Sequence, residues 1–172
     1  MSNETEKWLH EEDKGCFLQR AERLKWLISK APFEQIWIFP GGFLGKQLFE
    51  EARYCFVYGQ LLASAILGFA FVERTLAAMF YGAGRNDLQR ATSEVLFREG
   101  HTAGWLTAQE LEAFDKARRL RNPLVHFRKP LHKDSPEFRA VSDERHPYEV
   151  VEDDAKHILG VMFRLVQRNA VG

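Results

Sequence analysis

The chain has 172 residues, 24 of them acidic and 24 basic, and 45% are hydrophobic. This length suits one domain with its own hydrophobic core, and the composition excludes a chain that is disordered throughout. A formal net charge of zero gives no overall field that would attract nucleic acid, so any such binding must depend on local charge.

The cysteines and the N-terminal residues indicate the cellular compartment in which the protein is expected. Cys16 and Cys55 lie in helical or apolar contexts and predict buried, reduced thiols rather than a disulfide framework. Reduced thiols are typical of cytoplasmic proteins, so a cytoplasmic location is expected. The N-terminal stretch is polar and acidic, which predicts no secretory signal peptide.

Apolar periodicity in the first half of the chain predicts two helices. The first covers residues 4–30, with apolar side chains at steps of three or four, namely Phe17, Ala21, Leu24 and Ile28. Residues 33–43 predict a short extended stretch and a Pro-Gly-Gly turn but no sheet, because a single apolar run has no partner strand. A long helix is predicted over 46–81, ended by the glycines that follow it.

Three more helices are predicted in the second half. One covers 87–98, and Thr107 and Glu110 form a capping box that begins another, which runs toward residue 127. Prolines and charges over 129–147 predict a loop. Acidic residues then begin the last helix, which has the apolar stripe Ile158, Met162, Leu165 and Val166.

Five helices without a sheet predict an all-α antiparallel bundle in a single domain over 1–172. An N-terminal helix and extended segment would occupy 1–45, and the core bundle 46–169. The uncharged segment 54–72 approaches the length of a membrane span, although polar residues within it favour a helix buried in the bundle, with no membrane.

Two pairs of small residues, Gly59 with Ala63 and Ser64 with Gly68, have the four-residue spacing of one helix face. Such faces permit close approach of another backbone, either within the bundle or across a dimer.

The candidate functional residues lie in the segment that begins at Phe114. Arg121 falls in the middle of an apolar helix side, so it must pair with a carboxylate, lie at a subunit interface or line a pocket. Asn122 and His126 share a face four residues apart, and Pro123 is expected to kink the helix near them.

The same stretch carries a run of positive charge. No acidic residue occurs between 116 and 133, a segment that contains Lys116, Arg118, Arg119, Arg121, Arg128, Lys129 and Lys133. Such a run attracts a phosphate backbone, or it is a solvated cationic helix end favoured by the helix dipole. The histidines show no spacing with Cys or Asp typical of a metal site, so no metal is predicted.

Arg-Asn-Pro-Leu-Val-His at 121–126 resembles the Arg-x4-6-His motif of HEPN domains. The context is similar too, since the motif lies late on a helix, follows an apolar helix carrying Glu73, and precedes a loop and a closing helix. The resemblance covers roughly 46–167 and is most specific around the motif. It implies a helical domain that cleaves RNA by attack of the ribose 2′-hydroxyl, without metal or cofactor.

The resemblance also implies roles for individual residues. His126 would move a proton at the 2′-hydroxyl or the leaving oxygen, Arg121 would bind the scissile phosphate, and Asn122 would hold the phosphate or orient His126. Glu73 is either the partner of Arg121 or a surface charge. The expected RNA-binding side chains are Arg118, Arg119, Arg128 and Lys129.

Family members usually form homodimers with a composite site, and some are toxins or phage-defence effectors controlled by an antitoxin or another regulatory protein. Two functional hypotheses follow from the resemblance. One is a metal-independent endoribonuclease acting on RNA, and the other is a catalytically silent HEPN module that binds RNA or a partner protein.

Overall fold

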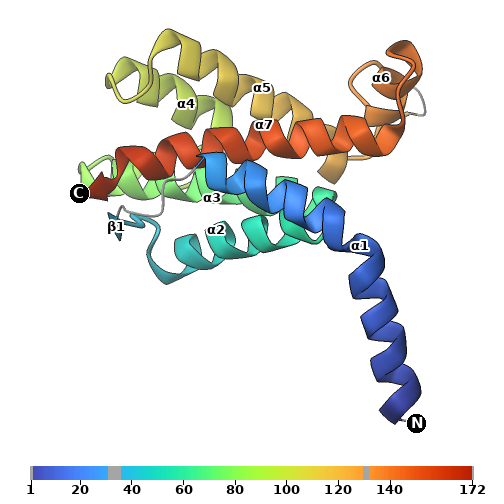
Figure 1. Ribbon diagram of the computed structural model, residues 1–172. Helices are drawn as coiled ribbons and strands as arrows, with labels where there is room; N and C mark the ends of the chain where they lie inside the picture. The colour runs from blue at the N-terminus through green and yellow to red at the C-terminus, as the bar shows by residue number, and fades with distance from the viewer. Residues whose placement is uncertain (1, 31–35, 130–131, 172) are drawn as a thin grey trace.

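The computed structural model describes residues 2–30, 36–129 and 132–171, which form a bundle of helices (Figure 1). The predicted all-α bundle is confirmed, but these ranges hold seven α-helices rather than five. The elements in chain order are α1 (Ser2–Lys30), β1 (Ile36–Trp37), α2 (Gly42–Val57), α3 (Leu61–Gly82), the 3₁₀ helix η1 (Asn86–Leu88), α4 (Ser93–Thr102), α5 (Ala108–Val125), α6 (Pro136–Ser142), α7 (Pro147–Arg168) and β2 (Ala170–Val171).

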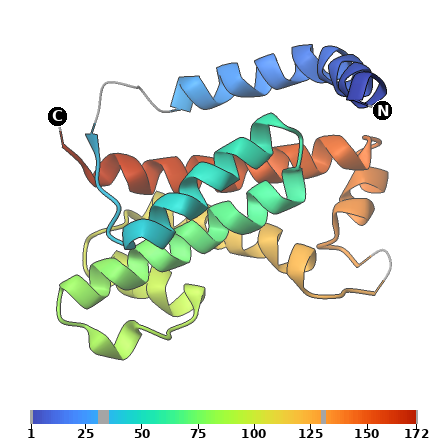
Figure 2. The same ribbon diagram turned by 90° about the horizontal axis from the view of Figure 1, so that it is seen from below.

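The long helix predicted over 46–81 is wrong, because the chain turns back between α2 and α3. Gly59 has a φ of 76°, in the left-handed region that glycine adopts without strain, and the two helices then lie side by side (Figure 2). The uncharged segment 54–72 therefore spans a turn and is not one membrane-length helix. The division at 45/46 falls within α2, which begins at Gly42.

α3 is the central helix and packs against α2 and α7 (Figures 1 and 2). It has 22 residues, and an 18-residue window within it has a mean hydropathy of 1.6. By length and composition alone this is enough to cross a membrane, and half of that window is buried in the bundle. The core helix of a soluble protein meets the same criterion, so the match is weak evidence for a membrane.

The small residues of α3 lie inside the bundle. Ser64 Oγ donates a hydrogen bond to the Ala52 carbonyl oxygen on α2 at 2.8 Å. A Cβ on Gly68 would lie 3.2 Å from Leu159 Cδ2 on α7. For the pair Ser64 and Gly68, close approach of another helix within the bundle is therefore observed. The pair Gly59 and Ala63 shares no helix face, because Gly59 lies in the turn before α3.

The segments around α4 and α6 depart from the predictions. The region 87–98 contains η1 and then α4, which is capped by Thr92 accepting a hydrogen bond from the Val95 N–H. The region 129–147 is not only loop, since it contains α6, capped by Ser135. A seven-residue helix is too short to show an apolar stripe in the sequence. α7 begins at Pro147, before the acidic residues expected to begin it.

α1 packs on the bundle through its C-terminal half, while its N-terminal half projects away (Figure 1). Leu27 is 2% exposed, and the Trp26 ring lies 5.2 Å from that of Phe56 on α2. The apolar stripe predicted to be buried is largely exposed, since Phe17 is 60% and Leu24 43% exposed. The bundle contacts a neighbouring face of α1 instead.

Two further details correct the predictions. β1 pairs antiparallel with β2, Ile36 opposite Val171 and Trp37 opposite Ala170, so the extended segment has a partner strand near residue 170; residues 33–35 lie outside the described ranges. Cys16 and Cys55 are free but only partly buried. Burial, with a smaller effect of the Glu51 charge, raises the pKa of the Cys55 thiol.

Candidate functional site

The motif 121–126 lies at the C-terminal end of α5. The predicted capping box begins this helix, because the Thr107 N–H donates to the Glu110 carboxylate at 2.8 Å and the Glu110 N–H donates to Thr107 Oγ1 at 3.2 Å. The helix continues through Pro123 and ends at Val125, two residues before the predicted end. His126 is the C-cap residue with an extended backbone, φ −122° and ψ 126°.

Arg121 is held against α3. Its Nη2 donates a hydrogen bond to Glu73 Oε2 at 3.0 Å, and its guanidinium carbon lies 4.5 Å from the centre of the Phe69 ring. The side chains of Arg121 and Glu73 are 20% and 31% exposed. Of the environments expected for a cation on an apolar helix side, pairing with a carboxylate is the one observed, and Glu73 is the partner.

Among the described residues, no hydrogen bond joins Arg121 and His126 within one chain. His126 is exposed, and neither its ring nor the half-buried Asn122 side chain has a hydrogen-bond partner among the described residues. The expectation that Asn122 and His126 share a helix face stays a prediction, because α5 ends at Val125 and His126 continues with an extended backbone. The exposed His126 residue thus lies just beyond the last turn of the helix, where its N–H still donates to the Asn122 carbonyl oxygen at 3.0 Å. The imidazole is therefore accessible from solvent.

The positive charge around the motif is partly neutralised. Arg118 is bonded to Asp115 at 3.2 Å and lies 3.8 Å from Glu94 on α4, so it is engaged within the chain. By contrast, the exposed side chains of Arg119, Arg128 and Lys129 form no ion pair within the described residues. These three cations remain available to a phosphate, and two of them, Arg128 and Lys129, lie shortly after the motif.

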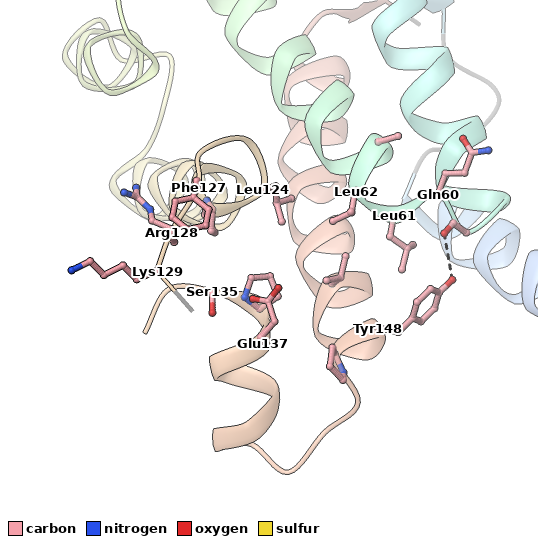
Figure 3. A pocket seen from close by; sticks show the side chains of 16 residues that line it. Gln60, Leu61, Leu62, Leu124, Phe127, Arg128, Lys129, Ser135, Glu137 and Tyr148 are labelled. Atoms are coloured by element: carbon pink, nitrogen blue, oxygen red, sulfur yellow. Dashed lines mark hydrogen bonds between the residues drawn. The ribbon is translucent and has the colours of Figure 1, made fainter. Parts of the chain in front are cut away.

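An open cavity lies beside the end of α5 (Figure 3). It has a volume of about 1160 Å³ and is bounded by the start of α3, the end of α5 and the first turns of α6 and α7. Its walls are mostly apolar and include Leu62, Leu124 and Phe127, while Arg128 and Lys129 lie at its α5 end. No sequence pattern indicated the cavity, since four separate segments build it.

One wall of the cavity is fixed by a polar network. The Tyr148 hydroxyl accepts a hydrogen bond from Arg23 Nη2 at 2.8 Å and donates one to the Gly59 carbonyl oxygen at 3.4 Å. Arg23, 6% exposed, also pairs with Glu152 at 3.3 Å. α1 thereby ties the start of α7 to the α2–α3 turn, a role that the sequence did not indicate.

A second wall depends on α6. Its Arg139 forms two hydrogen bonds to Asp154 of α7, which is 3% exposed. The side-chain hydrogen bonds that Arg139 donates to Asp154, opposed by burial, raise the pKa of Arg139 above its ordinary value. This pair, whose carboxylate is buried, links the short helix α6 to α7 and so positions the cavity wall that α6 supplies.

Two of the other histidines, His157 and His146, are engaged in structure. His157 Nε2 is bonded to the Ala113 carbonyl oxygen at 2.9 Å, and burial lowers its pKa below the ordinary value. His146 caps α7. Within the three described ranges, no cluster of three or more His, Cys, Asp or Glu side chains is arranged to hold a metal ion.

No protein-family model, curated protein or solved structure matches this chain. The features of the chain that bear on its function are therefore the motif, the geometry around it and the cavity beside it.

Proposed function

We propose that the chain is an endoribonuclease that cleaves RNA without a metal ion, at the C-terminal end of α5. The observation that carries this proposal is the arrangement of the motif. An exposed His126 lies at the end of the helix that holds Arg121, and after Phe127 come Arg128 and Lys129, which form no ion pair with the described residues. The resemblance to HEPN domains supplies the chemistry, and the cationic end of the cavity supports binding of a phosphate.

The step proposed at this site is an internal transesterification. His126 accepts the proton of a ribose 2′-hydroxyl, the 2′-oxygen bonds to the adjacent phosphorus, and the bond to the 5′-oxygen breaks. The products are a 2′,3′-cyclic phosphate and a 5′-hydroxyl, whose proton comes from water or from the histidine of a second subunit. The contact with Glu73 uses one of the five Arg121 donors, so others remain for the phosphate.

The test is an RNA cleavage assay in excess EDTA. Replacing His126 or Arg121 by alanine should lower the rate at least about 100-fold, the usual contribution of a positioned acid–base or oxyanion group. The matched controls are His10→Ala on the projecting half of α1 and the exposed Arg90→Ala, which should cleave like the wild type. Cleavage that requires a divalent ion, or that survives His126→Ala, would overturn the proposal.

Homodimerisation belongs to this proposal and has its own test. The two features that predicted a dimer, the small residues and Arg121, have partners within one chain. A dimer would instead bring His126 of one copy near Arg121 of the other. Light scattering measures the mass, and complementation between Arg121→Ala and His126→Ala chains should restore about a quarter to a half of the activity only if the site is shared.

A module that binds RNA or a regulatory protein without cleavage is the second candidate. The observation in its favour is that Glu73 and Phe69 hold Arg121, which is what a structural arginine requires. In that case His126→Ala leaves binding unchanged and no cyclic phosphate is formed, whereas replacing Arg128 and Lys129 weakens RNA binding.

A further inference from the structure

The cavity beside α5 leaves apolar side chains uncovered. Phe127 is 90% exposed and Leu62 53%, and both line the cavity with Leu124 (Figure 3). Its volume of about 1160 Å³ exceeds the roughly 300–1,000 Å³ typical of small-ligand sites. A nucleotide-sized group therefore fits, and the open side leaves an exit for a connected chain.

The charged side chains around the cavity are separated by the sign of their charge, with cations at one end and a carboxylate at the other. Arg128 and Lys129 follow Phe127 at the α5 rim of the cavity, where their side chains extend outward, and neither forms an ion pair with any described residue (Figure 3). Across the cavity, Glu137 extends from the first turn of α6 and also lacks an ion-pair partner in the described ranges (Figure 3). An occupant that matches these walls carries an anion, a flat π face and hydrogen-bond donors.

A nucleotide combines these three features in one unit. Its phosphate suits the two cations, its base can stack on the uncovered Phe127 ring, and the base edge can meet the Glu137 carboxylate. Among the bases, guanine has two adjacent N–H donors on its Watson–Crick edge, which match the two oxygens of a carboxylate. The charge pattern thus favours a guanine over a base with one donor.

We propose that this cavity binds one unstacked guanine of a single-stranded RNA and thereby selects the position of the strand at His126. This inference rests on the proposed function and specifies its substrate. Phe127 directly follows His126, so a base stacked on its ring places a neighbouring phosphate at the end of α5. Phe127 and Glu137 are then binding residues and take no part in proton transfer.

The test measures binding without cleavage. The probes are two fluorescein-labelled 2′-O-methyl hexanucleotides, one all uridine and one with a single central guanosine, because methylation blocks attack by the 2′-oxygen. In fluorescence anisotropy, the full chain should bind the guanosine probe about tenfold more tightly, as expected for one additional pair of hydrogen bonds to a charged group. Phe127→Ala should weaken binding of both probes about tenfold or more.

Two further variants separate the contributions. Glu137→Gln should remove the guanosine preference and leave binding of the uridine probe intact. Phe43→Ala, also an exposed phenylalanine at 74% but outside the cavity, should bind both probes like the wild type. Thermal unfolding by circular dichroism verifies that each variant is folded.

Three outcomes would overturn the inference: no RNA binding, binding that Phe127→Ala leaves unchanged, or equal affinities for both probes. Conversion of a dimer to a monomer by Phe127→Ala, with RNA binding unchanged, would assign the cavity to a second copy of the chain. The cleavage assay separates the two proposals. Guanosine-selective binding without cleavage would support the guanine site in the cavity and refute the endoribonuclease activity. Cleavage that depends neither on Phe127 nor on guanosine would support the endoribonuclease activity and refute the guanine site.

Discussion

The strength of the Arg121–Glu73 contact can be measured by a double-mutant cycle. Arg121→Met retains most of the side chain that packs on Phe69 but removes its charge, and Glu73→Gln removes the opposite charge at nearly constant volume. The two single variants and the double variant are compared with the wild type. The cycle isolates the coupling energy between the two side chains from the other effects of each substitution.

The expected coupling follows from the partial burial of the pair. A hydrogen bond to a charged group contributes about 1.5–3 kcal/mol when it is buried. A fully exposed ion pair contributes only about 0.2–1 kcal/mol. With side chains 20% and 31% exposed, the pair lies between these limits, so we expect a coupling of about 1–2 kcal/mol. Arg121→Met should cost about 0.5–1 kcal/mol more than Glu73→Gln, because it also removes the cation from the Phe69 ring.

Urea unfolding followed by circular dichroism gives the four free energies of unfolding. A matched control is the Arg98–Glu94 pair on α4, which has a similar distance of 2.9 Å but is 68% and 52% exposed. Its coupling should be about 0.3–0.5 kcal/mol. If the Arg121–Glu73 coupling is no larger than that of the control, burial does not strengthen the pair, and the structural explanation of Arg121 is refuted.

Three further predictions concern stability, each measured by the urea midpoint. Gly59→Ala should destabilise the fold by about 2–3 kcal/mol, because the residue has a positive φ and its Cβ would lie 2.9 Å from the Tyr148 hydroxyl. The control Gly84→Ala, at a position with a positive φ but open space, should cost about 1 kcal/mol. Equal losses of stability in the two variants would contradict the predicted clash with Tyr148. Thr75→Val should stabilise by up to about 1 kcal/mol, because Thr75 Oγ1 is buried without a hydrogen-bond partner in the described residues; a clear loss would imply that a partner exists. His157 has a lowered pKa in the folded state, so between that pKa and 6.5 the unfolded chain binds more protons than the folded chain. The free energy of unfolding should therefore fall as the pH drops below about 6.5, and His157→Gln should make this fall less steep. A pH profile that His157→Gln leaves unchanged would exclude the effect of burial on His157.

The sequence predicted the elements that have strong local signals. The box of Thr107 and Glu110 placed the start of α5 correctly, and the apolar stripe of the last helix is buried as expected. It missed the α2–α3 turn, because apolar residues continue on both sides of Gly59 and a lone glycine within such a pattern does not distinguish a turn from a helix. The exposed stripe on α1 was mispredicted because periodicity identifies an apolar face but does not say what covers it.

The candidate site was predictable only in part. An arginine on an apolar helix side needs a partner, and this rule narrowed the options for Arg121, but only the packing of α5 on α3 identifies Glu73. The orientation of His126 depends on a helix ending at Val125, and such boundaries are poorly determined by local sequence. The cavity is built from the ends of four helices, so the residues that line it lie far apart in the sequence and form no local pattern.

The central position of α3 has a consequence for synthesis of the protein. α2 precedes α3 and can fold back onto it as soon as both have left the ribosome, because only a short turn joins them. The opposite side of α3 must wait for α7, which is made some 65 residues later. Until then the most apolar helix of the chain exposes one face, and a nascent protein in this state is a candidate for chaperone binding and for aggregation.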